Sequence, residues 1–336
     1  MVSLSEVQTS NAQIANTFPP GLVAVFVGAT NGIGEAALKE FARTARSPRA
    51  YFVGRSQEAA ARIEAECRQL NPEGEFIFIK SDVSLIRNVD LVTREIQSKE
   101  KSINLLFLSC GTLRADEDTA EGLHIITAAA YYARTRFILN LLPELKRATH
   151  LRRVVSVLAG THEGPIDETD FQVRNMSMLK RRGQMVSMTS LTMETLAEKA
   201  PEVTFINDYP GPVKTGIGRE ANSLIGWFLF IVLSIIGPLI CIPIRESGER
   251  HLFFATSARY PPRVGDAVGV KVDGGEVARG NDGVAGSGVY SIGWRGDVAG
   301  EGVVRLLAGL REKGMREKVW EHTLKEFERI VGSNGV

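Results

Sequence analysis

Short apolar runs alternate with longer segments of helical periodicity along most of the chain. Runs such as LVAVFVG (22–28) and INLLFLS (103–109) are apolar at almost every position, which is typical of strands buried on both faces of a parallel sheet. The alternation predicts an α/β fold: a doubly wound parallel sheet of about seven strands with helices on both faces. The strands are predicted at residues 21–27, 49–54, 75–80, 103–109, 152–157, 203–208 and 288–292. The helices are predicted at residues 31–45, 56–70, 84–98, 120–147, 184–199, 247–257 and 312–330.

Two segments depart from this alternation. Residues 261–288 contain eight glycines with scattered charge, which predicts a mobile surface excursion with a weak hairpin. Residues 223–244 contain no charged residue. No internal repeat is visible, so we predict an N-terminal extension (1–20) and then a single domain (21–336) that includes both segments.

Composition and charge narrow the classes of protein. The 336 residues include 40 basic and 39 acidic side chains, and a net charge of +1 argues against nucleic acid as the main partner. Cys67, Cys110 and Cys241 are widely spaced, which fits a reducing compartment and neither a disulfide scaffold nor a zinc site. The N-terminus has no basic start followed by an apolar run, so no secretory signal is predicted and a cytoplasmic location is expected.

A glycine-rich turn follows the first predicted strand, in VFVGATNGIGEAAL (25–38). A strand that leads through glycines into a helix N-terminus lets backbone N–H groups and the helix dipole face a pyrophosphate. The Lys-Ser/Thr pair of a nucleotide-triphosphate loop is absent, and the alternative is an ordinary tight turn. The predicted dinucleotide-binding residues here are Gly28, Thr30, Asn31, Gly32, Ile33 and Gly34.

The ends of the next two strands suggest which dinucleotide binds. Arg55 follows the second strand, where an acid would bind ribose hydroxyls, and a guanidinium there suits a 2′-phosphate. Ser56 can add a hydrogen bond, so NADP(H) is favoured over NAD(H), although a solvated charge is the alternative for Arg55. After the third strand, Asp82 either caps the following helix or accepts from the adenine amino group while Val83 packs on the ring.

The motifs GATNGIG, GRS, SDV and YPGPVKTG together resemble the short-chain dehydrogenase/reductase superfamily, over roughly residues 20–260 and the strand near GVYSIGW. The resemblance implies a Rossmann-type fold that binds NADP(H). It places Gly111 in the turn after the fourth strand, and Pro210 and Gly211 beside the nicotinamide. It places Thr215 at the carboxamide, with Val213 between them. The stretches YYARTRFILNLLPEL and AGTHEGPID resemble the subgroup found in fungal secondary-metabolite pathways.

The superfamily's catalytic residues are not matched. Its members use a Tyr and a Lys four residues later, with a Ser and an Asn, because hydride addition to a carbonyl builds negative charge on the oxygen. No tyrosine here is followed by Lys at that spacing, and the corresponding helix, GQMVSMTSLTMETLA, contains neither residue. Ser156 matches the first of two serines, the position that normally acts is Val157, and the Asn position aligns near Ala130.

Two interpretations follow from this departure. In the favoured one the protein still transfers hydride, and the candidate catalytic residues are Ser156, Tyr131 and Tyr132, with the alternative that the tyrosines pack in the core. Further candidates, each with a solvated or capping alternative, are His162, Glu163, Ser187, Thr189 and Ser190. In the second interpretation the cofactor site is kept while the protein does non-redox work, as an isomerase, a cyclase or a scaffold.

The uncharged segment 223–244 would reach about 33 Å as one helix, close to the thickness of a bilayer core. Gly237-Pro238 interrupts it, and both flanks belong to one fold, which argues against a single crossing. We predict an apolar lid (216–246) over a hydrophobic small-molecule substrate. The lid either contacts a membrane surface through Trp227 and Phe228 or is buried against the body or a second copy. Membrane contact by the lid would give a peripheral position on an intracellular membrane, and the family resemblance implies a homodimer paired through the two long helices. LKRRG (179–183) is interpreted as a solvated charge run.

Overall fold

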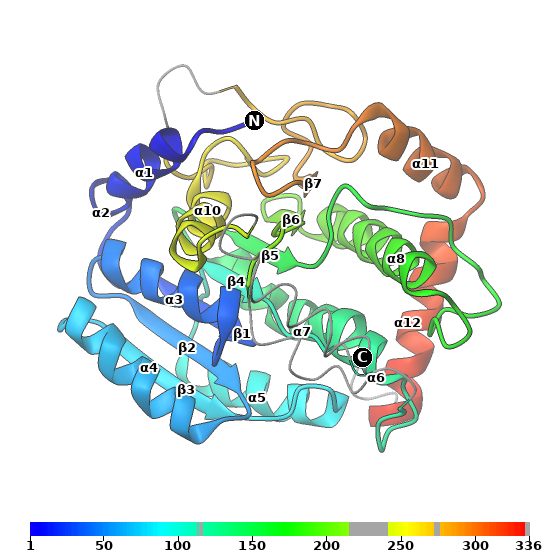
Figure 1. Ribbon diagram of the computed structural model, residues 1–336, viewed down its shortest axis with the longest axis horizontal. Helices are drawn as coiled ribbons and strands as arrows, with labels where there is room; N and C mark the ends of the chain where they lie inside the picture. The colour runs from blue at the N-terminus through cyan, green and yellow to red at the C-terminus, as the bar shows by residue number, and fades with distance from the viewer. Residues whose placement is uncertain (113, 115–116, 215–240, 272–275, 333–336) are drawn as a thin grey trace.

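Seven parallel strands form one sheet in the order β3-β2-β1-β4-β5-β6-β7 in the computed structural model, which describes residues 1–112, 114, 117–214, 241–271 and 276–332 (Figure 1). All seven predicted strands are confirmed. Their bounds are β1 Val23–Val27, β2 Arg49–Gly54, β3 Glu75–Lys80, β4 Leu105–Leu108, β5 Arg153–Val157, β6 Thr204–Asp208 and β7 Val289–Ile292. The strand order reverses between β1 and β4, and ligands of such sheets bind outside the carboxyl ends of the strands at this point.

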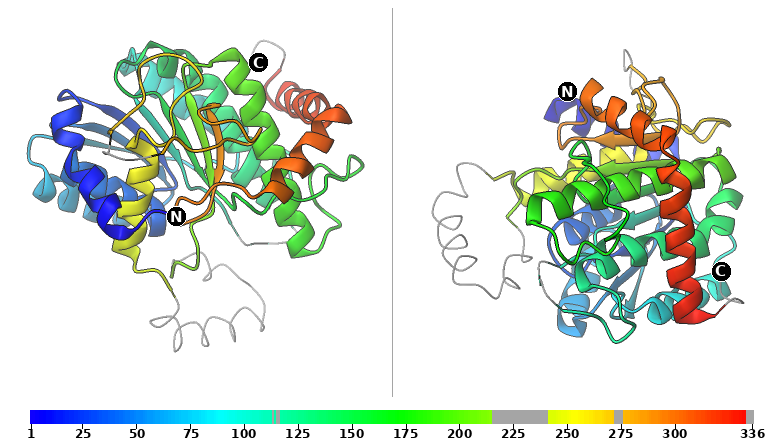
Figure 2. Two further views of the ribbon diagram at one scale, coloured as in Figure 1. Left: turned by 90° about the horizontal axis from the view of Figure 1, so that it is seen from above. Right: turned by 90° about the vertical axis from the view of Figure 1, so that its right-hand side faces the viewer.

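Helices cover both faces of the sheet, as the apolar strands predict (Figures 1 and 2). On one face, α3 (Gly32–Thr44), α4 (Gln57–Leu70) and α10 (Ile244–Thr256) bury side chains against Phe26, Phe52 and Phe107. On the other face lie α5 (Ile86–Lys99), α7 (Ala133–Arg147) and α8 (Met178–Lys199). Alternate residues of each strand enter the two cores, so both sides of β1 and β4 are buried.

The predicted helix 120–147 is wrong in its first part. Residues 120–124 form a loop, and helical structure begins with α6 (Ile125–Thr127), continues as a π-helical segment η1 (Ala128–Tyr132) and becomes α7. The wider turn of η1 lies where two consecutive tyrosines are buried against other helices. A local pattern cannot show this, because the contacts come from residues far along the chain.

The two ends of the chain contribute more structure than predicted. The extension 1–20 contains α1 (Leu4–Ala12) and α2 (Ile14–Thr17), and its Val7, Ile14 and Phe18 are buried in the core beside α10. The predicted helix 312–330 is confirmed as α12 (Met315–Val331). A helix that was not predicted, α11 (Glu301–Glu312), precedes it and is separated from it at Gly314, whose φ is +67°. In Figures 1 and 2, α12 crosses the outside of the α8 layer.

The glycine-rich segment 261–288 is packed more closely than a mobile excursion. Within its described part, Val270 pairs with Ser257 in an isolated bridge, and Arg279 pairs with Ala285 in an antiparallel one, which is the expected small hairpin. Val270 and Ala278 are buried. Most of the predicted lid, residues 215–240, lies outside the described residues, and no described helix has the length and apolar character needed to cross a membrane.

Candidate functional site

The glycine turn lies at the carboxyl end of β1, in contact with the end of β4. Gly28 has a φ of +85°, and a Cβ at this position would lie 2.5 Å from the backbone nitrogen of Cys110. A Cβ at Gly34 would lie 2.6 Å from the carbonyl oxygen of Gly28. Only glycine fits both positions, so these two glycines let β1, α3 and β4 approach one another closely.

The N-terminus of α3 is open for a ligand. Its N-cap residue Asn31 is exposed, and no side chain caps the helix. Gly32, the first helical residue, has a φ of +61°. The first N–H groups of an uncapped helix attract a phosphate through hydrogen bonding and the helix dipole. The turn therefore has the geometry of an anion site, with Thr30 and Ile33 half-buried beside it.

Arg55 and Ser56 follow the carboxyl end of the neighbouring strand β2. Arg55 is exposed at this edge. The Ser56 Oγ accepts a hydrogen bond from the Ala59 N–H at 3.2 Å and caps α4, so its hydroxyl hydrogen is still able to donate to a phosphate. A Cβ at Gly54 would overlap the Cγ2 and lie 2.5 Å from the Oγ1 of Thr30, so the end of β2 lies directly against the glycine turn.

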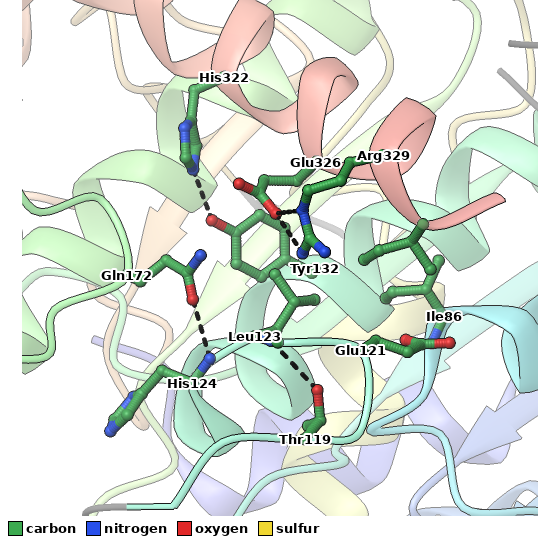
Figure 3. Close-up of polar contacts among 12 residues, drawn as sticks. Ile86, Thr119, Glu121, Leu123, His124, Tyr132, Gln172, His322, Glu326 and Arg329 are labelled. Atoms are coloured by element: carbon green, nitrogen blue, oxygen red, sulfur yellow. Dashed lines mark hydrogen bonds and ion pairs between the residues drawn. The ribbon is translucent and has the colours of Figure 1, made fainter. Parts of the chain in front are cut away.

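Asp82 and Val83 follow β3 at the same edge, and the capping role considered for Asp82 is wrong. The Asp82 Oδ1 accepts from the N–H of Ser84 at 3.1 Å and from its Oγ at 2.7 Å. The first N–H groups of α5 instead donate to the buried carboxylate of Glu121, at 2.6 Å from Ile86 and 3.1 Å from Arg87 (Figure 3). The exposed Asp82 is therefore left beside the site, and Val83 is half-buried.

The loop after β6 closes the far side of the site. Pro210 and Gly211 follow the strand, and a Cβ at Gly211 would lie 2.6 Å from the Cδ1 of Ile242 and 2.9 Å from the Cγ of Trp294. Val213 pairs with Ile242 in a parallel bridge. Gly111 lies after β4, and Thr215 lies outside the described residues. Since all the described cofactor candidates follow carboxyl ends of parallel strands, they share one edge of the sheet.

Ser156 is buried within β5, and its hydroxyl is occupied. The Arg134 Nη1 donates to the Ser156 Oγ at 2.8 Å and to the Val157 carbonyl oxygen at 2.7 Å. The Arg134 Nε donates to the Cys110 carbonyl oxygen at 3.1 Å. Ser156 thus helps to hold a buried cation between the ends of β4 and β5, and its contact is to Arg134 rather than to an open pocket.

The two tyrosine candidates pack between helices. The Tyr131 hydroxyl lies 2.8 Å from the Thr192 Oγ1 on α8 and 2.7 Å from the Thr323 Oγ1 on α12. The Tyr132 hydroxyl lies 2.6 Å from the His322 Nε2 on α12 (Figure 3). Burial raises the pKa of Tyr131 to about 12, so its hydroxyl stays protonated. Both side chains are fully buried, which is the packing role considered as the alternative.

The hydroxyls of α8 donate hydrogen bonds either to the segment after β5 or to the helix itself. The Ser187 Oγ donates to the Gly164 carbonyl oxygen at 2.6 Å, and the Thr189 Oγ1 donates to the Met185 carbonyl oxygen at 2.9 Å. The Ser190 Oγ donates to the Glu163 Oε1 at 2.9 Å. Burial raises the pKa of Glu163, so this carboxyl is not the solvated group that a polar loop predicts. His162 is half-buried, with its ring 4.5 Å from that of Tyr209.

Sequence reasoning missed two buried charged groups at this edge. One is Arg134, and the other is the pair of Asp208, the last residue of β6, and His251 on α10, whose Oδ2 and Nε2 lie 3.0 Å apart. A signal was present for both. Arg134 directly follows the run AAAYYA, and Asp208 is the one charged residue of its strand, TFIND.

The geometry agrees with comparisons to known proteins. A family model described as short chain dehydrogenase matches residues 22–140. Oxidoreductase AN1596 of Emericella nidulans is 41% identical over 337 residues, covering 98% of this chain and 99% of the relative. The chain belongs to the short-chain dehydrogenase/reductase family. The resemblance seen in the motifs is thereby confirmed, and the predicted fold with it.

A second curated relative and a solved structure also match. Oxidoreductase andH of Emericella variicolor is 39% identical, covering 99% of each chain. The solved structure of L-sorbose reductase from Gluconobacter frateurii, complexed with NADPH and L-sorbose, superposes with a TM-score of 0.55 at 17% identity, covering 71% of this chain and 91% of that one. This structural likeness shows the shared fold.

Proposed function

We propose that the protein is an NADP(H)-dependent oxidoreductase that acts on a hydrophobic small molecule, a ketone or alcohol or an enone. The carrying observation is the uncapped N-terminus of α3 behind the positive-φ glycines Gly28 and Gly32. It forms an anion site at the strand-order switch between β1 and β4. The family membership of the chain supports the redox chemistry.

The preference for NADP(H) rests on Arg55 and Ser56. Both follow β2, and an exposed guanidinium beside a hydroxyl that can still donate suits a 2′-phosphate. A 2′-phosphate carries negative charge that the ribose hydroxyl of NAD(H) lacks. Binding of NADPH should therefore depend on Arg55, whereas binding of NADH should not.

Calorimetric titration tests this proposal. Purified protein is titrated with NADPH and then with NADH, and the titrations are repeated on Arg55→Ala. Arg68→Ala is the control, because Arg68 is an exposed arginine in the last turn of α4, paired with Glu64. We expect Arg55→Ala to weaken NADPH binding about tenfold, or about 1.4 kcal/mol, with NADH binding and the control unchanged. If the wild type binds neither NADPH nor NADH, the proposal is refuted.

The substrate class and pathway are part of the same proposal. The uncharged residues 223–244 follow the loop at Gly211, so an apolar substrate is expected beside the cofactor. The relatives from Emericella nidulans and Emericella variicolor support a role in fungal secondary metabolism. Steady NADPH consumption with a ketone or enone from a panel of apolar compounds is the expected result. Tight nucleotide binding without turnover of any compound would instead favour the non-redox alternative.

Contact with a membrane surface is a second proposal, which the end of α8 favours. Met178 and Leu179 are 74% and 72% exposed, beside the exposed Lys180. Met178 lies twelve residues, or about 18 Å along the helix, before Ser190, which contacts Asn207 of β6. We expect co-sedimentation with phosphatidylserine vesicles that is lost in the double variant Met178→Ser, Leu179→Ser. Equal co-sedimentation of both proteins would refute this contact, and pairing of two copies stays a prediction for ultracentrifugation.

A further inference from the structure

Two arginines are buried at opposite ends of β5. Arg153 starts the strand, is 0% exposed, and donates to the carbonyl oxygens of Phe254 and Ser257 at 2.9 and 3.1 Å. Arg134 comes from α7, is 4% exposed, and lies at the other end of the strand against Ser156 and Val157. A buried guanidinium is costly, because its charge leaves water. Two such cations in one strand region allow a matched comparison.

Arg134 is held by neutral oxygens. Its hydrogen bonds reach the carbonyl oxygens of Cys110 and Val157 and the hydroxyl of Ser156, with both Nε and Nη2 donating to Cys110. Among the described residues, no carboxylate accepts a hydrogen bond from it. Burial lowers the pKa of the guanidinium, and the nearby Asp208 carboxylate acts in the opposite direction. An arginine keeps its proton in such surroundings, so the site contains a fixed positive charge.

The buried Asp208 is paired with His251 rather than with Arg134. The His251 Nδ1 lies 2.6 Å from the Ser247 carbonyl oxygen, which can only accept, so Nδ1 holds a proton. The Nε2 lies 3.0 Å from the Asp208 Oδ2, within ion-pair distance. Among the described residues, no hydrogen bond or ion pair joins Asp208 to Arg134, so the guanidinium has no directly paired anion.

Arg134 lies beside the turn after β4, next to the glycine turn. Its Nη2 is 3.7 Å from the position of a Cβ on Gly111, which follows β4. Cys110, which accepts from Arg134, is also the residue whose backbone touches the glycine turn at Gly28. Cys110 therefore links the guanidinium to the turn that would bind the pyrophosphate. The guanidinium lies between the ends of β4 and β5, and the Pro210-Gly211 loop follows the next strand of the sheet, β6.

We propose that Arg134 makes the protein select the reduced cofactor, so that NADPH binds more tightly than NADP⁺. The inference rests on the proposed function. The two forms share the adenine, the ribose phosphates and the pyrophosphate, and they differ in the nicotinamide ring, which carries a positive charge only in NADP⁺. A fixed cation at the carboxyl ends of β4 and β5 repels that charge, and a low-dielectric surrounding strengthens the repulsion. The same cation favours negative charge on a substrate oxygen at this edge, which suits reduction.

Calorimetric titration with NADPH and with NADP⁺ tests the inference in four proteins: the wild type, Arg134→Gln, Arg134→Lys and Arg153→Gln. The measured quantity is the ratio of the NADP⁺ dissociation constant to that of NADPH. We expect a ratio of about ten or more in the wild type, or about 1.4 kcal/mol, and a fall toward one in Arg134→Gln. Arg134→Lys keeps the charge and should keep the ratio. Arg153→Gln removes an equally buried cation from the distant end of β5 and should also keep it.

The outcomes separate the inference from the proposed function. If neither nucleotide binds the wild type, the proposed function fails. If both bind the wild type with equal affinity, the inference fails while the function stands, and this result needs no variant to fold. An unchanged ratio in Arg134→Gln, a lost ratio in Arg134→Lys, or an equal loss in Arg153→Gln would each overturn the assignment of the selectivity to the charge of Arg134.

Discussion

Substituting alanine for Gly28 should separate backbone strain from close packing in the glycine turn. Gly28 and Gly21 have nearly the same φ, +85° and +84°. A Cβ at Gly28 would lie 2.5 Å from the nitrogen and 2.8 Å from the Cα of Cys110, whereas a Cβ at Gly21 would meet nothing within 4 Å. Gly21→Ala is therefore a control that contains the strain without the clash.

The two contributions have different sizes. An L-residue in the left-handed region costs about 1–2 kcal/mol, which both variants share. The clash at Gly28 is with backbone atoms at the end of β4, which cannot rotate away, and forcing extra volume into a packed site costs about 1–3 kcal/mol more. We expect Gly28→Ala to lose about 2–5 kcal/mol of unfolding free energy, against about 1–2 kcal/mol for Gly21→Ala.

Urea unfolding followed by tryptophan fluorescence measures both losses, because the chain contains three tryptophans. Titration with NADPH then measures the affinity of the dinucleotide site. Gly28→Ala should weaken NADPH binding, whereas Gly21→Ala should not. The reasoning would be refuted if the two variants lost equal stability, because the end of β4 would then yield to the added methyl group without cost.

Three further predictions concern buried polar groups. Glu121→Ala should lower the free energy of unfolding by about 1–2 kcal/mol in urea titrations, because the first N–H groups of α5 lose their acceptor; unchanged stability would contradict this. Tyr132→Phe should lose about 1 kcal/mol in the same assay with the hydrogen bond to His322, and NADPH affinity should not change; weaker NADPH binding would argue against a packing role. The raised pKa of Glu163 makes its contribution to stability fully present below the pKa of the unfolded chain and lost as pH rises through the folded value. Glu163→Gln should therefore gain thermal stability relative to the wild type between pH 4 and pH 8, and a constant difference in melting temperature would exclude this titration.

The sheet and the dinucleotide turn were predictable from the sequence. Strands buried on both faces need apolar residues at every position, and β1 and β4 show that pattern without interruption. Gly28 and Gly32 have positive φ, and a Cβ would not fit at Gly28 or Gly34, so the turn needs glycines at positions that can be recognised in the sequence. The apolar runs and the glycine spacing are local patterns, so the sequence by itself indicated both features, although the close contact that requires glycine at Gly28 is with Cys110 at the end of β4.

Tertiary structure decided the polar interior of the site. Glu121 caps α5 from 35 positions along the chain, Arg134 binds the ends of two strands that precede and follow its own helix, and Tyr132 meets His322 on α12. The helical segment predicted at 120–147 starts only at Ile125, because residues 120–124 form a loop that brings Glu121 to α5. Hydrogen bonds and charges of this kind depend on which segments meet in space. A local pattern of residue types does not contain that information, so only the fold determined their roles.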